Sequence, residues 1–346
     1  MHASVITLPS FRERRRALTI LAVLLALACV SILFACGIGS VALSTGELFA
    51  ALGEIMRGEP STLAATLLEL RLGRALSAFV TGAALALAGV MMQALLRNPL
   101  ADPYVLGVSG GAAVGALTAM LFFTAAWAVD VAAFGGAVAV AFLLFALAYR
   151  DLRGSGSGDG SAPMLLLTGV IVASGCGALV TLMLSIAPDN RLRGMVFWLI
   201  GDLSATQSRW LPWVIWLGAL AFAIRVARAL NVVALHAEAA ATLGISVGKL
   251  RRGLFLCAAL LTASAVSSAG SIGFVGLIVP HACRFAWGPD HRLLLPAATL
   301  AGGSFLVLAD TLARSVIAPQ QLPVGVITAL IGVPVFLAQL HHIHRK

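Results

Sequence analysis

Apolar stretches of about twenty residues recur along the whole chain, and they exclude most water-soluble folds. The segments 17–39, 74–96 and 163–187 are examples. A helix of about 20 apolar residues spans the roughly 30 Å hydrocarbon core of a bilayer. In total, 60% of the 346 residues are hydrophobic and 11% are charged, whereas soluble domains carry about 25% charged residues. The sequence therefore predicts an all-α, polytopic membrane protein.

Charged breaks between the apolar runs divide the chain into about ten predicted transmembrane helices, which form a single transmembrane domain over residues 1–346. They are expected at 17–39, 74–96, 105–124, 129–149, 163–187, 210–230, 252–270, 273–287, 293–315 and 324–341. The eighth is short and contains glycines, so we expect it to be bent or only partly spanning. Residues 40–71 are expected to form an outer connection that holds a short surface helix.

The distribution of basic residues predicts the orientation of these helices. An even number of crossings places both termini on the same side of the membrane. Most of the 23 Lys and Arg residues fall on that side, including the arginines within 12–16 and the pair at 345–346. Cytoplasmic connections are enriched in Lys and Arg, so both termini are expected in the cytoplasm. The same bias explains the net charge of +9 without a nucleic-acid partner.

The few polar motifs within this pattern do not indicate an enzyme. The chain contains no G-x-x-x-x-G-K-[ST] phosphate-binding loop, so it is not a P-loop ATPase. The sequence around Ser109 matches G-x-S-x-G, but the strand-to-helix turn and the acid and histidine partners of a hydrolase are not visible. Asp310 and Arg314, four residues apart, are expected to pair on one helix. An ion-coupled carrier that uses Asp310 as its proton site, and an intramembrane enzyme, are the alternatives from other classes.

The cysteines and histidines do not form a recognisable metal site. All five cysteines lie in apolar segments without a C-x-x-C pair, which indicates small core side chains rather than a disulfide framework. The histidines at 341, 342 and 344 are interpreted as part of a solvated tail. Neither a metal nor a cofactor is therefore expected on this chain.

Several motifs, in order along the chain, resemble those of the permease subunits of bacterial ABC importers for iron chelates, haem and cobalamin, the FecCD/BtuC-like family. Asn98–Pro103 is similar to the family's N-P-L-A-[DE]-P loop, and Gly273–His281 to G-F-[IV]-G-L-[IV]-[IV]-P-H. Further matches lie at 71–74, 290–296, 309–314 and 322–328. In the first of these, glycine at position 73 stands where the family's R-L-P-R has proline.

This resemblance implies a BtuC-like type II importer permease in the bacterial inner membrane. The permease would form a homodimer with a substrate path along the two-fold axis. Two cytoplasmic ABC ATPase subunits would bind ATP and Mg²⁺ and supply the energy, and one periplasmic binding protein would deliver the cargo. Membrane lipid would surround the dimer, and the chain itself would bind no cofactor.

The resemblance also assigns a docking role to three residues. Arg71, Arg74 and Arg314 match arginines that face outward and receive glutamates from the two lobes of the binding protein. Guanidinium groups form paired, directional hydrogen bonds with carboxylates, which suits the orientation of a docking partner. The alternative for these arginines is anchoring to lipid phosphates.

On the inner side, the resemblance indicates a gate and a coupling segment. Asn98 and Leu100 align with the inner-gate loop. The segment at about 231–252 resembles the coupling segment that lies in a groove of the ATPase, and its Ala-rich pattern suits a short helix ended by glycine. The residues expected to contact the ATPase are Leu235, His236, Glu238, Ala239, Ala240, Leu243 and Gly244.

The polar segment after the fifth predicted helix resembles that of haem permeases, so haem is the predicted cargo. Arg191 and Arg193 would attract its propionates. Met183, Met195 and Phe197 would offer soft apolar contacts along the substrate path. A cobalamin or ferric-siderophore importer is the alternative within the same class, and a short interfacial helix with an aromatic anchor is the structural alternative for the segment.

Overall fold

The computed structural model describes residues 11–344, with gaps at 40, 42, 59–60, 124, 150–160, 205–209, 236–239 and 241. All the regular elements within these ranges are helical, which confirms the predicted fold class. Seven helices, α1, α3, α5, α7, α9, α11 and α13, are long and apolar enough to cross a membrane. The remaining predicted spans correspond to the shorter helices α4, α12 and α14.

The helix bounds follow the apolar runs closely. In chain order the elements are α1 (Phe11–Gly37), α2 (Thr45–Arg57), α3 (Leu63–Leu96), the 3₁₀ helix η1 (Pro103–Leu106), α4 (Val108–Phe122), α5 (Ala126–Leu147), α7 (Ser161–Ile186), α8 (Asp189–Ile200), α9 (Trp210–Leu235), α11 (Val247–Ala269), α12 (Val275–Trp287), α13 (His291–Ser315) and α14 (Val324–His344). The predicted surface helix in the outer connection is α2. It begins with a capping box between Ser44 and Glu47 and ends at Gly58, whose φ is +75°.

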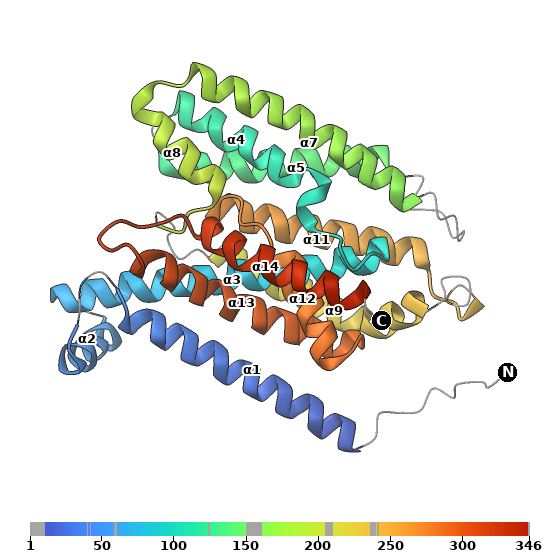
Figure 1. Cartoon of the computed structure of the whole chain (residues 1–346), viewed down its shortest axis with the longest axis horizontal. Helices are drawn as coiled ribbons and strands as arrows, with labels where there is room; N and C mark the ends of the chain where they lie inside the picture. The colour runs from blue at the N-terminus through green and yellow to red at the C-terminus, as the bar shows by residue number, and fades with distance from the viewer. Residues whose placement is uncertain are drawn as a thin grey trace.

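Helix α3 forms the centre of the bundle. In the most apolar 18-residue stretch of α3, 94% of the residues are buried inside the protein, whereas the corresponding share for α1, at the edge, is 17%. It packs against α13, α11, α12, α9 and α1, whereas α4, α5 and α7 form a layer on one side (Figure 1). The outer helices therefore keep broad apolar faces for lipid, and the polar contacts that define the candidate site gather around α3.

Glycines allow the neighbours of α3 to approach its backbone directly. A Cβ added at Gly89 would lie 1.9 Å from the carbonyl oxygen of Gly276 on α12, and one added at Gly82 would lie 2.3 Å from that of Gly302 on α13. Without hydrophobic driving force in lipid, small residues that permit such close packing hold helices together. On α4, a Cβ added at Gly115 would lie 2.0 Å from the backbone of α5, so a glycine permits the same close packing between these two helices.

The start of α3 differs from the prediction. The second span was expected from residue 74, but α3 begins at Leu63, where the Thr62 side chain accepts a hydrogen bond from Ala65 N at 3.2 Å. The carboxylate of Glu54 on α2 in turn accepts the Thr62 N–H at 3.0 Å. Arg71 and Arg74 do not break the helix, because their side chains find partners in neighbouring elements.

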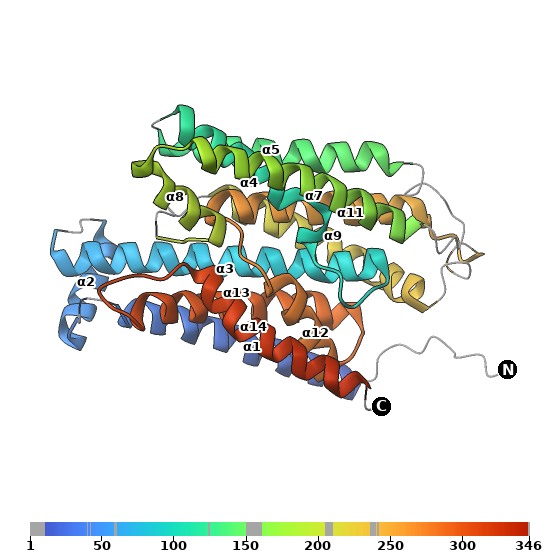
Figure 2. The ribbon, with the colours of Figure 1, turned by 45° about the horizontal axis from the view of Figure 1, so that its top comes forward.

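Both ends of the described chain lie at one end of the bundle. The N-terminal end of α1 and the C-terminal end of α14 are on the same side, and α2 and α8 are on the opposite side (Figures 1 and 2). This arrangement agrees with an even number of crossings.

Candidate functional site

Helix α3 carries one polar region near its start, around Arg71 and Arg74, and a second region directly after its end, in the Asn98–Pro103 loop. Its 34 residues make a helix about 50 Å long at 1.5 Å per residue, which exceeds the roughly 30 Å hydrocarbon core. Roughly twenty residues before Leu96, the helix reaches the opposite membrane surface near Arg74. Arg71 and Arg74 therefore belong to one face of the membrane, and the Asn98–Pro103 loop belongs to the other.

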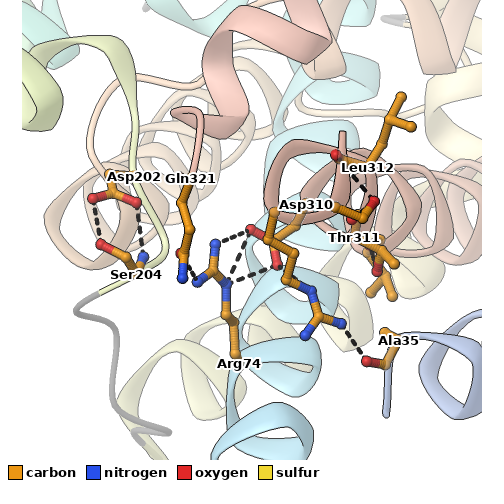
Figure 3. Close-up of polar contacts among 11 residues, drawn as sticks. Ala35, Arg74, Asp202, Ser204, Asp310, Thr311, Leu312 and Gln321 are labelled. Carbon is orange, nitrogen blue, oxygen red and sulfur yellow. Dashed lines mark hydrogen bonds and ion pairs between the residues drawn. The ribbon is translucent and has the colours of Figure 1, made fainter. Parts of the chain in front are cut away.

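At the outer end, Arg74 is held between α13 and the segment that precedes α14. Its Nη2 lies 2.8 Å from Asp310 Oδ1 and its Nε lies 2.9 Å from Oδ2, so the pair is bidentate. A third contact runs from Nη1 to Gln321 Oε1 at 2.7 Å (Figure 3). The side chains of Arg74 and Asp310 are only 13% and 3% exposed. This contact ties α3 to the outer ends of two other elements.

Arg71 and Arg314 instead satisfy the end of α1. The last carbonyl groups of a helix lack partners within the helix. Arg71 Nη1 donates to Cys36 O at 3.1 Å, and Arg314 Nη2 donates to Ala35 O. Both arginines are 7% exposed. They were expected to face outward, but in this structure they point into the protein and bind α1.

The pairing within α13 is weaker than the sequence indicated. Arg314 Nε lies 4.0 Å from Asp310 Oδ2, beyond hydrogen-bonding distance, and has no hydrogen-bond partner. Asp310 bonds more closely to Arg74, which lies 236 positions away. Two guanidinium groups thus lie beside one carboxylate, and Arg71 also contacts the end of α1 that Arg314 binds. Together these four residues form an outer cluster (Arg71, Arg74, Asp310, Arg314) with three cations and one anion.

At the inner end, the two predicted gate residues form a tight turn. Arg97 ends α3 with φ +47°. Asn98 Oδ1 then accepts the N–H of Leu100 at 2.9 Å, and Asn98 O accepts that of Ala101 at 3.1 Å. The side chain of Leu100 remains exposed. The local geometry gives Asn98 a structural role in the turn, and the gating role of both residues stays a prediction.

The next residues connect this turn to the second long motif. Asp102 Oδ1 accepts the N–H of Tyr104 at 2.8 Å and so caps η1. Tyr104 Oη accepts the N–H of Ile272 at 3.1 Å. Pro103 lies against Gly276, where an added Cβ would be 2.9 Å from its ring. The two motifs, more than 160 positions apart, therefore form one inner clamp (Asp102, Pro103, Tyr104, Ile272, Gly276).

Burial affects the ionisation of this clamp. It raises the pKa of Asp102 to about 6, although the hydrogen bond from Tyr104 N opposes the shift. Burial also raises the pKa of the Tyr104 phenol, with a further contribution from Asp102. Tyr104 therefore stays protonated and keeps its hydroxyl. Sequence reasoning missed Tyr104 and Ile272 as partners, because nothing in either local pattern indicates the other.

A second inner contact, also missed, joins α3 to α12. Arg284 Nη2 donates to Gln93 Oε1 at 2.9 Å, and Gln93 Nε2 donates to the carbonyl of Leu277 at 3.3 Å. Gln93 is buried, and a buried amide needs such partners. Its position in the middle of an apolar run was the available signal for a role in helix pairing.

The predicted coupling segment is only partly described. His236, Glu238 and Ala239 lie outside the described residues. Leu235 is the last residue of α9. Of the others, Ala240 is buried, Leu243 is exposed, and Gly244 has φ +79°. The turn expected at Gly244 is therefore present, and the contact with an ATPase stays a prediction.

The predicted substrate-path residues are distributed over different environments. The polar segment after the fifth predicted span forms the short helix α8 (Asp189–Ile200). A short helix was the structural alternative for this segment. Arg191 Nη1 donates to Met120 O and Leu121 O, both at 2.6 Å, at the end of α4. Met195 is fully buried. Arg191 is thus partly buried and bound to the end of α4, and Met195 is enclosed, while the path role of both stays a prediction.

The other three predicted path residues are less enclosed. Arg193 lies over the ring of Phe197, with its Cζ 5.4 Å from the centroid. Met183 is partly buried, and its sulfur lies 3.8 Å from the hydroxyl of Thr118. Arg193 and Phe197 together place a cation beside an aromatic face on α8, at the same end of the bundle as α2 (Figure 1).

Seven helices long and apolar enough to cross a membrane, joined by polar contacts between them, indicate a multi-pass membrane protein. The model of the FecCD transport family matches residues 24–342, so the chain belongs to that family, as its motifs indicated. The chain is an ABC importer permease, and its family is one of transmembrane permeases rather than catalytic enzymes.

Individual relatives cover most of the chain. The cobalamin import system permease protein BtuC of Halobacterium salinarum is 44% identical over 287 residues, 81% of this chain and 74% of that protein. The hemin transport system permease protein HmuU of Yersinia pestis is 41% identical over 280 residues, 78% and 81% of the two chains. A solved metal-chelate type ABC transporter in an inward-facing conformation aligns with a TM-score of 0.77 and 30% identity, covering 94% of this chain and 99% of that one.

Proposed function

We propose that this chain is the permease subunit of an ATP-driven importer that moves haem across the inner membrane into the cytoplasm. Two copies would form the path, with both termini in the cytoplasm. Separate ATPase subunits would bind ATP and Mg²⁺, and a periplasmic binding protein would deliver the haem. Family membership supports this division of labour, because ABC permeases operate in complexes with other subunits.

The outer cluster carries the docking part of the proposal. Its four side chains comprise three arginines and one carboxylate, of which Arg74 and Arg314 lie beside Asp310, so added carboxylates from a partner would reduce an unfavourable excess of like charge. Arg74 is the most exposed of the three side chains and would be contacted first. Arg71 and Arg314 would have to leave the C-terminal end of α1 to bind a partner directly.

Haem is supported by the outer end of α8. Arg193 offers a cation for a propionate, and Phe197 beside it offers an aromatic surface for the porphyrin. The similarity to a hemin transport permease agrees with this assignment. Cobalamin is the second candidate, because the permease from Halobacterium that is named for it is 44% identical over 81% of this chain.

An ion-coupled carrier fits the structure less well. Its proposed proton site, Asp310, is held by three hydrogen bonds from Arg74 and is almost fully enclosed. Because both oxygens of this carboxylate already accept hydrogen bonds from Arg74, it is not free to bind a transported ion. Energy would therefore come from the ATPase subunits.

Inward release would depend on the inner clamp. ATP would close the ATPase pair, the coupling segment would transmit that movement to α9 and α11, and the two subunits would reorient around the path. The bond from Ile272 N to Tyr104 Oη joins the inner turn to the start of α12, so both would move as one unit. Asn98 and Leu100 on that turn would then open or close the exit.

The test is uptake into proteoliposomes that contain the permease with its ATPase and binding protein. We expect haem uptake that requires ATP and persists when a protonophore collapses the ion gradients. An excess of cobalamin should not compete. Transport of cobalamin but not haem would establish the second candidate, and uptake without the ATPase would contradict the importer assignment.

A further inference from the structure

A cavity of about 500 Å³ lies between the N-terminal end of α1 and the connection from α12 to α13. Arg14 and Arg16 line it from α1, and Arg292 lines it from the first turn of α13. Trp287, at the end of α12, and Leu21 form apolar parts of its wall. None of these residues belongs to the outer cluster or the inner clamp.

Three guanidinium groups and two carboxylates line the cavity, so its charged side chains carry an excess of one positive charge. Within the described part of the chain, the structure records no ion pair or hydrogen bond for the guanidinium groups of Arg14, Arg16 and Arg292. Two carboxylates also line the cavity, but both are engaged. Asp290 Oδ1 accepts from Asn231 Nδ2 at 2.6 Å and from the N–H of Arg292 at 3.0 Å, and Glu13 has a partner as well. Three guanidinium groups are therefore free to bind an anion.

The position of the cavity indicates where that anion comes from. The apolar run of α1 begins immediately after Arg16, so the arginines lie at headgroup depth, where tryptophan is also enriched. Leu21 is partly buried in the wall, and Leu25, one turn further into the membrane, is exposed to lipid. The cavity thus has a basic rim, and the exposed apolar surface of α1 continues from it at Leu25.

We propose that this cavity binds an anionic phospholipid, with its headgroup phosphate held by Arg14, Arg16 and Arg292 and one acyl chain along Leu21 and Leu25. The lipid would connect α1 to the start of α13. The outer end of α13 carries Asp310, so a bound lipid would also stabilise the helix that holds the outer cluster. This site is independent of the cargo assignment.

The test is a titration of the purified full-length protein with phosphatidylglycerol in detergent, followed by native mass spectrometry and thermal unfolding. A basic residue near an anionic surface contributes about 1 kcal/mol, which is roughly five-fold in affinity. Each of Arg14→Gln, Arg16→Gln and Arg292→Gln should therefore weaken binding about five-fold. Arg228→Gln, an exposed arginine on α9 that does not line the cavity, should bind as the wild type does.

Two further arms distinguish the source of the anion and the location of the chain. Phosphatidylcholine and inorganic phosphate should bind much more weakly than phosphatidylglycerol. Phosphatidylglycerol with brominated chains should quench tryptophan fluorescence, and the quenched fraction should fall in Trp287→Phe. Equal binding of phosphatidylcholine, stabilisation by inorganic phosphate alone, or quenching unchanged in Trp287→Phe would each overturn the proposal. Wild-type affinity in all three arginine variants would do the same.

Discussion

Replacement of Asp310 by asparagine should destabilise the protein more than replacement of its partner Arg74 by glutamine. Asp310 is 3% exposed, accepts three hydrogen bonds from Arg74 and lies 4.0 Å from Arg314. Asp310→Asn leaves both guanidinium groups enclosed without a counter-charge, and breaking a buried ion pair in this way costs about 3–5 kcal/mol. In Arg74→Gln, the carboxylate keeps Arg314 nearby, so we expect a smaller loss of about 1–3 kcal/mol.

Equilibrium unfolding in mixed micelles, monitored by tryptophan fluorescence, measures both losses. Glu69→Gln is the control, because this exposed carboxylate lies on the same helix as Arg74 and should change the free energy of unfolding by no more than about 0.5 kcal/mol. The double variant Arg74→Met/Asp310→Leu should recover part of the loss, since it removes both buried charges together. An Asp310→Asn loss equal to or smaller than that of Arg74→Gln would refute the charge reasoning.

Three other measurements test the packing and the inner clamp. Gly89→Ala should cost about 1–3 kcal/mol, because its Cβ would lie 1.9 Å from a backbone carbonyl of α12, whereas Gly177→Ala meets nothing within 4 Å and should be neutral. Tyr104→Phe should cost about 1–3 kcal/mol of unfolding free energy by leaving Ile272 N without its acceptor; unchanged stability would show that the clamp is not formed. The raised pKa of Asp102, about 6 against an ordinary 3.8, means that the folded state binds its proton more tightly than the unfolded state. Stability should therefore fall by up to about 3 kcal/mol as pH rises from 4 to 6, and Asp102→Asn should abolish this part of the pH dependence in denaturant titrations.

The helices at the ten predicted positions, seven of them long and apolar enough to cross a membrane, could be predicted because lipid imposes a local requirement. Within hydrocarbon, every backbone N–H and C=O must bond inside its own helix, so length and hydropathy alone identify each crossing. The capping residue Thr62 could in principle have shown that α3 starts early. The charges at Arg71 and Arg74 pointed instead to a helix boundary, and this expectation was wrong because the partners of those side chains are not visible locally.

The amino-acid sequence by itself determined the class of protein, the apolar helices and the family, since these depend on periodic composition and contiguous motifs. Only the tertiary structure decided which polar groups meet. Arg74 binds Asp310 from 236 positions away, Tyr104 receives the N–H of Ile272 from 168 positions away, and Arg191 caps α4. Such contacts are set by the three-dimensional packing of helices, whose neighbours and rotations depend on small residues such as Gly89 rather than on any pattern within one segment.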